Sequence, residues 1–439
     1  MSEQILLLSM AIPFGLLGGL LMAMPISLIL TLSFPILLTL EPNYAIAFYA
    51  IVAITTQFTN SVMALYAGIP GDISALPIIS ERKRLSVYFT IKENLQRTAV
   101  ASGVGVIIGI FYLTLVFEFI SPFTNYLIRS DFIFLILISV LIILLFWPGN
   151  KLLTNAFLIF AGGVIGMVGY HHTLKTTFLT FDNPILYGGL PFIAGFCGMY
   201  AVPNILSLSK FYAECSNEKT GSDKKITSEK YRISTKNLFF TSIMGSLAGV
   251  IGLIPLIGTS ISSNFLYRIS KKFTNSPIKL AALSESCNSS AHILVLSPLL
   301  FFGIAIVPSE MVLLSAIETN AWRVSHVTTE TFSLLIITAS ITLVISYFFS
   351  TTFSKILVEL LKKYVKYSVP ILLIVLTFNV YFVGSLTKEI EIYIITFILS
   401  AVVGIILDRL NISSLPLIIF WAVSESIINV GLTVKSLYF

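Results

Sequence analysis

The sequence predicts an all-α, polytopic integral membrane protein, and three observations support this fold class. Of the 439 residues, 56% are hydrophobic and only 11% are charged, whereas a soluble domain carries about 25% charged residues. Apolar runs of about 20 residues recur along the chain, each long enough to cross the hydrocarbon core as a helix. The runs are continuously apolar, whereas the strands of a membrane β-barrel alternate. We expect about 10–12 spanning or re-entrant helices.

The net charge of +6 is attributed to membrane topology. Lys and Arg collect in the cytoplasmic loops of membrane proteins, and the chain has no basic helix with interleaved aromatic residues, so no nucleic-acid partner is expected. Cys197, Cys215 and Cys287 lack the spacing of a disulfide framework or a zinc site. No metal site or bound cofactor is therefore expected. The first residues, MSEQ, lack the positive region of a cleavable signal peptide.

Four segments concentrate Lys and Arg, and the positive-inside rule places all four in the cytoplasm. They are residues 81–97, 210–236, 267–279 and 354–366. Four apolar spans separate the first two loops, near 98–119, 131–147, 153–170 and 185–207. Two spans separate the last two loops, near 283–307 and 331–352. Both numbers are even, so the topology is self-consistent.

Between the second and third of these loops lies an apolar region that is predicted to form a broken hairpin. Gly252, Pro255 and Gly258 interrupt it, and it is short for two full crossings. Non-helical backbone at membrane depth is tolerated only where it is buried in protein or lines a cavity. We therefore expect a hairpin that enters and leaves from the cytoplasmic face, with two tight spans joined at Pro255 as the alternative.

The N-terminal region shows the same pattern with opposite flanks. It is interrupted at Gly18, Gly19 and Pro25, and neither end bears Lys or Arg, so both ends are placed outside. The next span carries the chain inward through Asn60, and its counterpart carries the chain outward through Asn288. Inverted repeats with paired broken helices point to a secondary transporter with its substrate site between the repeats.

This interpretation divides the chain into five segments. They are a first repeat (1–97), central spans (98–209), a cytoplasmic loop (210–237), a second, inverted repeat (238–352) and C-terminal spans (353–439). The first repeat holds one hairpin and a broken helix, and the second repeat holds the other hairpin.

The stretch TNSVMALYAGIPGDISALP, residues 59–77, supplies half of the predicted site. Its glycines permit close backbone approach, and freed N–H groups can bind the oxygens of an anion. The substrate contacts predicted here are Thr59, Asn60, Ser61, Gly68 and Gly71. Asp72 is interpreted as a helix N-cap, with a part in cation coupling as the alternative.

The second half of the predicted site is SESCNSSAH, residues 284–292, the densest polar cluster in an apolar span. Spacings of three and four residues place its acid, amide and imidazole side chains on one helical face. The predicted contacts are Glu285, Asn288, Ser289, Ser290 and His292. These polar groups either line a site or bond neighbouring helices, and a bond from His292 to a nearby carbonyl is equally open.

An enzyme is not expected, because no nucleophile and base stand at a recognisable spacing. His171 and His172 are placed in an external loop, and His326 is placed in a second external segment. All three are interpreted as solvated side chains.

Motifs in both halves carry a family resemblance. In the first half they are Pro25, Pro35, Glu41-Pro42, Thr59-Asn60-Ser61 and Gly68-Ile69-Pro70-Gly71-Asp72. In the second half they are Gly252-Leu253-Ile254-Pro255-Leu256-Ile257-Gly258, the run Ser284 to Ser290, and the run Ser297 to Ile306. With the central stretches FLIFAGGVIGMVGY and YGGLPFIAGFCGMYAVPNIL, this order resembles a divergent large membrane subunit of the tripartite tricarboxylate transporters, the TctA-type permeases.

The resemblance implies a permease in the cytoplasmic (inner) membrane of a prokaryote that takes up small di- or tricarboxylates. It implies a small membrane subunit and a periplasmic solute-binding protein as partners, and uptake driven by a gradient of Na⁺ or H⁺. The inverted repeats favour an elevator-like movement, and the Gly-rich helices are compatible with a homodimer. Two alternatives stay open: a stand-alone translocator of another anion such as a lipid-linked phosphate, and a membrane scaffold.

Overall fold

The computed structural model describes a helical membrane protein. The described residues are 2–22, 25–66, 73–120, 130–147, 150–171, 176–207, 234–253, 258–302, 305–319, 329–353, 356, 367–422 and 424. Within them, seven helical stretches are long and apolar enough to span a membrane: Glu3–Leu20, Pro42–Leu65, Ile91–Phe119, Thr235–Leu253, Glu330–Phe353, Val369–Thr387 and Ile390–Arg409. Leu152–Gly166 and Phe192–Ser207 are shorter apolar helices. The prediction of an all-α polytopic membrane protein is confirmed.

The chain forms two compact units, each built from two separate stretches. Unit 1 comprises Met1–Ser121 and Ser209–Ser368, and unit 2 comprises Pro122–Leu208 and Val369–Phe439. The two predicted repeats, 1–97 and 238–352, both lie in unit 1. The five segment boundaries and the inverted relation of the repeats stay predictions.

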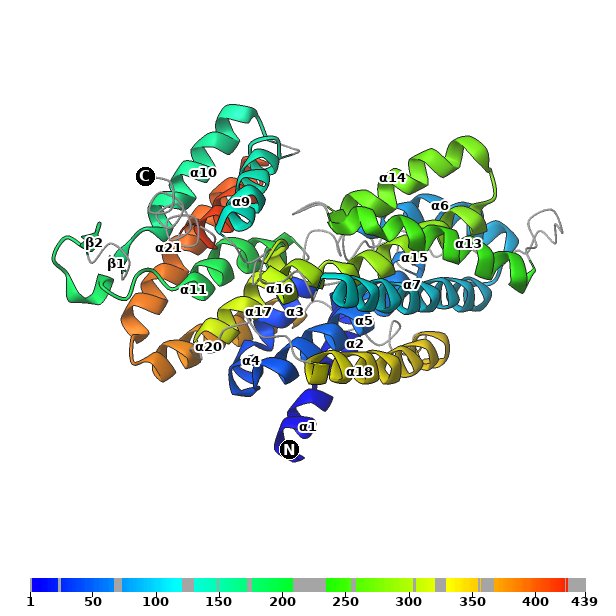
Figure 1. Ribbon diagram of the computed structural model, residues 1–439, viewed down its shortest axis with the longest axis horizontal. Helices are drawn as coiled ribbons and strands as arrows, with labels where there is room; N and C mark the ends of the chain where they lie inside the picture. Colours follow the sequence, from blue (N-terminus) through cyan, green and yellow to red (C-terminus); the bar gives the residue numbers. More distant parts are fainter. Residues whose placement is uncertain are drawn as a thin grey trace. The chain divides into compact units, whose positions relative to one another are not determined.

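Unit 1 contains the helices of both predicted repeats (Figure 1). The first stretch holds α1 (Ser2–Ser9), α2 (Ala11–Met22), α3 (Ile26–Leu32), α4 (Phe34–Thr39), α5 (Pro42–Tyr66), the 3₁₀ turn η1 (Ile73–Ala75), α6 (Leu76–Tyr88) and α7 (Ile91–Ile120). The second holds α13 (Thr235–Leu247), the 3₁₀ helix η6 (Ala248–Leu253), α14 (Gly258–Phe273), α15 (Pro277–Leu294), α16 (Leu296–Phe302), α17 (Pro308–Thr319), α18 (Thr329–Phe348) and the π-helical η7 (Phe349–Phe353).

The expectation of an N-terminal break at Gly18 and Gly19 is wrong. Helix α2 runs through both residues, and Pro25 stands as the N-cap of the next helix, α3. The helical glycines serve packing instead, because a Cβ at Gly15 or Gly19 would overlap threonine side chains of α5. A helix tolerates glycine, at a cost of about 1 kcal/mol relative to alanine, where close packing compensates.

The second region of broken helix is only partly described. Gly252 lies in η6, where the α-helix tightens into 3₁₀ geometry, and Gly258 is the first residue of α14. Pro255 lies outside the described residues. Helices α13 and α14, with η6 between them, all pack against α15.

Helices α5 and α15 form the buried centre of unit 1. Every residue from Ala45 to Leu65 in α5 is buried, and so is every residue from Ser284 to Leu294 in α15. Helices α2, α3, α17 and α18 pack against α5, α13 and α14 pack against α15, and α6 and α7 pack against both. Residues 59–61 of the first polar segment and residues 284–292 of the second therefore lie inside the protein.

Glycines four residues apart bring the neighbouring helices close to α15. On α7, a Cβ at Gly105 would lie 2.5 Å from the Ser286 carbonyl oxygen, and one at Gly109 would lie 3.0 Å from Ile293 Cβ. A Cβ at Gly245 of α13, or at Gly249 of the η6 helix that follows it, would overlap serine side chains of α15. Small residues at this spacing let helix backbones approach closely in membranes.

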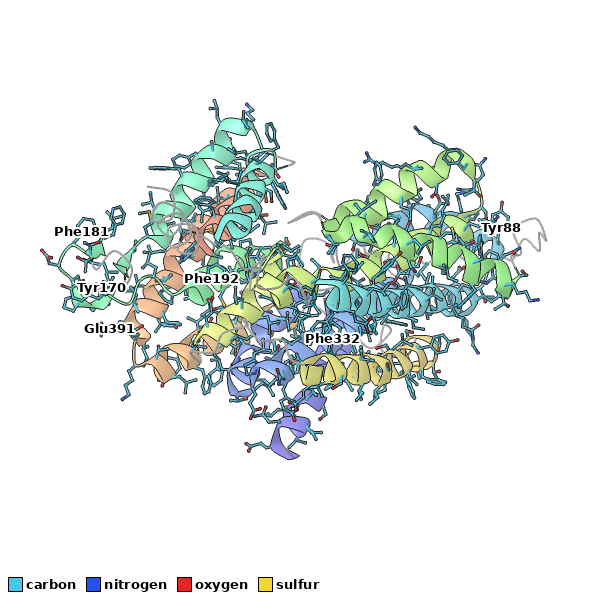
Figure 2. All side chains as sticks on the ribbon, viewed as in Figure 1. Tyr88, Tyr170, Phe181, Phe192, Phe332 and Glu391 are labelled. Atoms are coloured by element: carbon cyan, nitrogen blue, oxygen red, sulfur yellow. The ribbon has the colours of Figure 1, made fainter. Side chains whose placement is uncertain are left out.

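The outer side of α18 is apolar and exposed. Ile337, Ile341, Val344 and Phe348 recur at helical spacing and are each more than half exposed. The other face turns inward, where Phe332 stacks on Phe117 of α7 with the ring centroids 4.3 Å apart (Figure 2). One stripe of the helix is thus suited to lipid contact, and the opposite stripe to packing.

Unit 2 contains α9 (Ser130–Leu145), α10 (Leu152–Gly166), β1 (Gly169–His171), β2 (Thr176–Phe178), the 3₁₀ turn η3 (Pro184–Leu186), α11 (Phe192–Phe196), the π-helical η4 (Cys197–Ala201), α20 (Ser368–Thr387) and α21 (Ile390–Arg409). Glycine contacts also join helices here. A Cβ at Gly198 or Gly404 would overlap backbone atoms across the contact between η4 and α21.

One small hairpin departs from the helical pattern. Strands β1 and β2 pair antiparallel, with Gly169 opposite Phe178. Residues just beyond the hairpin, including Phe181 at φ 48°, take left-handed backbone conformations. Tyr170 and Phe181 mark this region in Figure 2. His171 lies in β1, within the segment that we interpreted as an external loop.

We predict that Gly105→Ala destabilises the protein, whereas Gly103→Ala does not. The new methyl group at Gly105 meets backbone of α15, and overpacking of this kind costs about 1–3 kcal/mol. Gly103 is the matched control, since its added Cβ would meet only Leu343 at 4.0 Å. Thermal unfolding in detergent measures both variants, and equal midpoints for the two would contradict this account of the α7–α15 contact.

Candidate functional site

The two polar segments predicted from the sequence meet where α5 contacts α15. Ser61 Oγ donates a hydrogen bond to Glu285 Oε1, and Asn288 Nδ2 donates one to Gln57 Oε1 at 2.8 Å. The later residue of α5 pairs with the earlier residue of α15, so the helices run in opposite directions across the contact. Side chains from both predicted repeats thus form one polar cluster.

A third helix, α7, completes the cluster. Ser102 Oγ donates a hydrogen bond of 2.5 Å to the same oxygen, Glu285 Oε1, that Ser61 contacts. Gly105, nearly one turn further along α7, rests on α15 and faces Ser289. Glu285 is only 2% exposed, and it forms no ion pair with a described residue. Two neutral hydroxyl groups are therefore its hydrogen-bond partners in the described part of the chain.

Four buried polar atoms of this cluster have no hydrogen-bond partner among the described residues. They are Gln57 Nε2, Asn60 Oδ1, Asn288 Oδ1 and Ser289 Oγ. Most buried polar atoms in proteins are hydrogen-bonded, and leaving one unsatisfied costs about 1–3 kcal/mol. Both donors and acceptors are among the four, so the cluster can bind a ligand that carries oxygen atoms or positive charge.

Two of the predicted contacts hold helices together. Thr59 Oγ1 donates to the Thr55 carbonyl oxygen of its own helix at 2.9 Å and also packs against Gly19 of α2. Ser290 Oγ donates to the Ser246 carbonyl oxygen of α13, also at 2.9 Å. These hydroxyl groups are already bonded, and their assignment as substrate contacts stays a prediction.

Of the remaining predicted residues, the structure describes some and not others. His292 is buried on α15, four residues beyond Asn288. Gly68, Gly71 and Asp72 lie outside the described residues, as do His172, His326 and Cys215.

The sequence interpretation missed Gln57 and Ser102. Gln57 precedes Ser61 by one helical turn, in an otherwise apolar part of α5 that also carries threonines. That spacing is a signal that could have identified it. Ser102 stands beside the glycines of α7, and nothing in its local sequence distinguishes it from a small packing residue.

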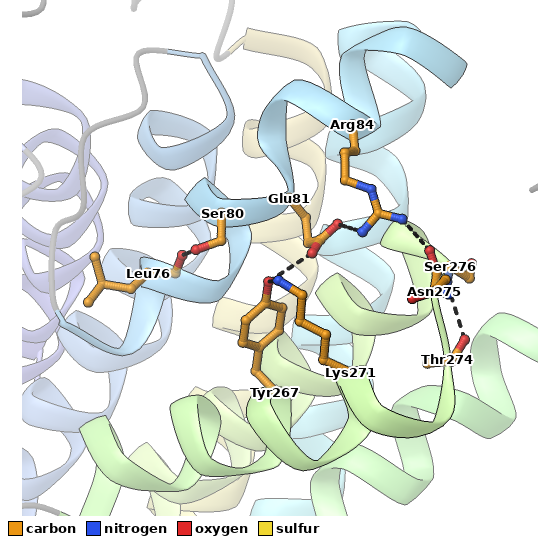
Figure 3. Close-up of polar contacts among 9 residues, drawn as sticks. All are labelled: Leu76, Ser80, Glu81, Arg84, Tyr267, Lys271, Thr274, Asn275 and Ser276. Carbon is orange, nitrogen blue, oxygen red and sulfur yellow. Dashed lines mark hydrogen bonds and ion pairs between the residues drawn. The ribbon is translucent and has the colours of Figure 1, made fainter.

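A second polar cluster links α6 to α14 (Figure 3). Glu81 is 1% exposed, accepts a hydrogen bond of 2.8 Å from the Tyr267 hydroxyl, and pairs with Arg84 at 2.7 Å. Lys271 donates to the same hydroxyl at 3.1 Å, and Arg84 also donates to the Asn275 carbonyl oxygen. Burial, and then the contact with Glu81, raises the pKa of Tyr267. The cluster joins residues of the first and third predicted cytoplasmic loops.

A third buried acid, Glu310, stabilises the start of helix α17. Its Oε2 accepts hydrogen bonds from the backbone N–H groups of Ile306 at 2.7 Å and Val307 at 3.3 Å, just before α17. An acid near the N-terminus of a helix that reaches back to these N–H groups stabilises the helix start. Ser309 beside it bonds the hydroxyl of Tyr49 on α5 at 3.0 Å. Helix α17 is thereby joined to the first repeat.

No group of three or more His, Cys, Asp and Glu side chains within the described ranges is placed to hold a metal ion.

The family model described as the tripartite tricarboxylate transporter TctA family matches residues 6–419 of the chain. Neither the curated proteins nor the solved structures gave a match.

Proposed function

The chain belongs to the tripartite tricarboxylate transporter TctA family, and we propose that it is a permease that takes up small di- or tricarboxylates by secondary transport. The family is one of transporters, not of enzymes. The observation that carries the proposal is the single polar cluster formed by Gln57 and Ser61 of α5 with Glu285 and Asn288 of α15. In secondary transporters built from repeats, the substrate site lies between the repeats.

Side-chain groups supply the chemistry for binding a carboxylate in this proposal. Gln57 Nε2 and Ser289 Oγ are unpartnered within the described residues and can donate hydrogen bonds to carboxylate oxygens. Asn60 adds an amide next to Ser61. The predicted turn at Gly68 to Gly71 would add backbone N–H groups.

The packing of unit 1 supports the proposed inverted repeats. Gly15 and Gly19 of α2 pack closely against α5, and Gly245 of α13 and Gly249 of η6 pack closely against α15 in the same manner. The relation extends to the helices that follow, since α6 packs against α14 and α17 packs against α3 and α4. Each half thus covers the hairpin region of the other.

An elevator-like movement of unit 1 relative to unit 2 is part of the proposal. Both hairpin regions and the polar cluster belong to one compact unit, which could carry bound substrate across the membrane as a body. The small membrane subunit, the periplasmic solute-binding protein, the inner membrane of a prokaryote and a homodimer complete the proposed setting.

Cysteine pairs that join the two units test the movement. A panel of pairs is made with one cysteine in unit 1 and the other in unit 2, and the pairs that crosslink are assayed in vesicles. We expect uptake to stop on crosslinking and to return on reduction, while single-cysteine proteins transport throughout. Full uptake by a crosslinked protein would exclude the elevator movement.

Uptake of labelled citrate and succinate into vesicles that contain the full set of proposed subunits tests the function. We expect Asn60→Ala and Asn288→Ala to lower uptake about tenfold or more, since the loss of about 1.4 kcal/mol of binding free energy changes affinity tenfold. Ser284→Ala is the control, because Ser284 Oγ bonds its own helix at the Leu280 carbonyl oxygen.

Unchanged uptake in both asparagine variants would remove the site assignment. No uptake of any carboxylate by the wild type, together with transport of a lipid-linked phosphate, would replace the proposal with the stand-alone translocator. Genes for a binding protein and a four-span subunit beside this one would favour the tripartite arrangement.

A further inference from the structure

We propose that a sodium ion binds at Glu285, at the junction of α5, α7 and α15, and that this ion couples the cation gradient to uptake. The coupling role rests on the proposed function, whereas binding of the ion does not. The ligands that we assign are oxygens of Glu285, Ser61, Ser102, Asn60, Asn288 and Ser289.

The first argument is the charge of Glu285. Its side chain is buried, its two bonded neighbours in the described part of the chain are hydroxyl groups, and it forms no ion pair with a described residue. Burying a carboxylate without a compensating charge is costly in a low-dielectric interior. A bound cation removes that cost directly.

The second argument is the supply of oxygen ligands. Asn60 Oδ1, Asn288 Oδ1 and Ser289 Oγ are buried without a described partner. All three belong to residues within about one helical turn of the Ser61–Glu285 contact. Ser289 faces α7, where Ser102 lies, and Asn288 faces α5 through Gln57. Hard cations are bound by several carboxylate, amide and hydroxyl oxygens of this kind.

A proton on Glu285, in place of a sodium ion, would leave more of the nearby buried oxygens without a partner. It would neutralise the charge, but it would supply one donor, whereas two amide oxygens need a partner. An amide oxygen accepts hydrogen bonds or binds cations and cannot donate. A metal ion satisfies these oxygens and the carboxylate together.

The same charge explains why the ion would couple to the substrate. Glu285 belongs to the cluster that we propose for carboxylate binding, and two negative charges in a buried site repel each other strongly. Sodium bound at Glu285 removes the repulsion, so each ligand favours the binding of the other. This reciprocity is the thermodynamic requirement for coupled binding.

Thermal unfolding of the purified protein without substrate tests the binding of sodium. NaCl replaces choline chloride at constant ionic strength, with KCl as a second reference. We expect saturating Na⁺ to raise the midpoint by about 2–4 °C in the wild type and in the Ser284→Ala control. Glu285→Gln should show no Na⁺-dependent rise, and Ser102→Ala should need at least threefold more Na⁺ for half of the effect.

An equal Na⁺-dependent rise in Glu285→Gln would overturn the proposal. The proposal would also be overturned if the unfolding midpoint of the wild type did not change with Na⁺ but changed with pH, and if Glu285→Gln removed that pH dependence. The site would then bind a proton. If Glu285→Gln does not fold, Ser61→Ala and Ser102→Ala are used as the test variants. An unfolding midpoint that depends on Na⁺ in both variants as it does in the wild type would reject the sodium site.

The outcomes separate this inference from the proposed function. Sodium binding that requires Glu285, without carboxylate uptake in vesicles, leaves the ion site standing and rejects the carboxylate permease. Carboxylate uptake that does not depend on Na⁺, in a protein that binds no Na⁺, keeps the permease and rejects the ion site.

Discussion

The contact between polar side chains of α5 and α15 is the constraint on which the rest of unit 1 depends. The parts of both helices that meet are buried, so their amides, hydroxyls and the Glu285 carboxylate depend on partners inside the protein or on a bound ligand. The partners inside the protein reach them only where the neighbouring helices come close. Glycines of α2, α7 and α13 permit that approach by presenting no side chain at the contact. Polar chemistry at the centre and glycine packing around it are therefore parts of one arrangement.

The sequence predicted the fold class and the meeting of two polar segments, because each rests on a strong local signal. Long apolar runs leave little choice but helices, and Asn60-Ser61 and Asn288-Ser289 stand out within them. Gly18 and Gly19 were misjudged because glycine both breaks helices and packs them. The side chains opposite α2 show which role applies: Ile29 of α3 lies against Gly18, and Thr59 of α5 lies against Gly19. Ser102 escaped notice for a similar reason, since its importance depends on a carboxylate distant in sequence.

Cross-packing between the two halves links the fold to the proposed transport. Helix α6 follows the first polar segment and packs on α14 of the second hairpin region, where Glu81 meets Tyr267. Helix α17 follows the second polar segment and packs on α3 and α4 of the first. The hairpin region of each half thus packs on its own central helix and also on helices of the other half. A site between them is then held by helices from both halves.

Protection from thiol labelling by substrate tests the central claim most directly. Asn60→Cys and Asn288→Cys are each introduced where Cys197, Cys215 and Cys287 are replaced by alanine, and labelling by a small water-soluble reagent is followed with and without citrate or succinate. If one site spans both helices, the same carboxylate slows labelling of both cysteines, each at a concentration high enough to saturate the remaining uptake of that variant. Protection of only one cysteine, or of neither, in a protein that still takes up the carboxylate would contradict a shared site.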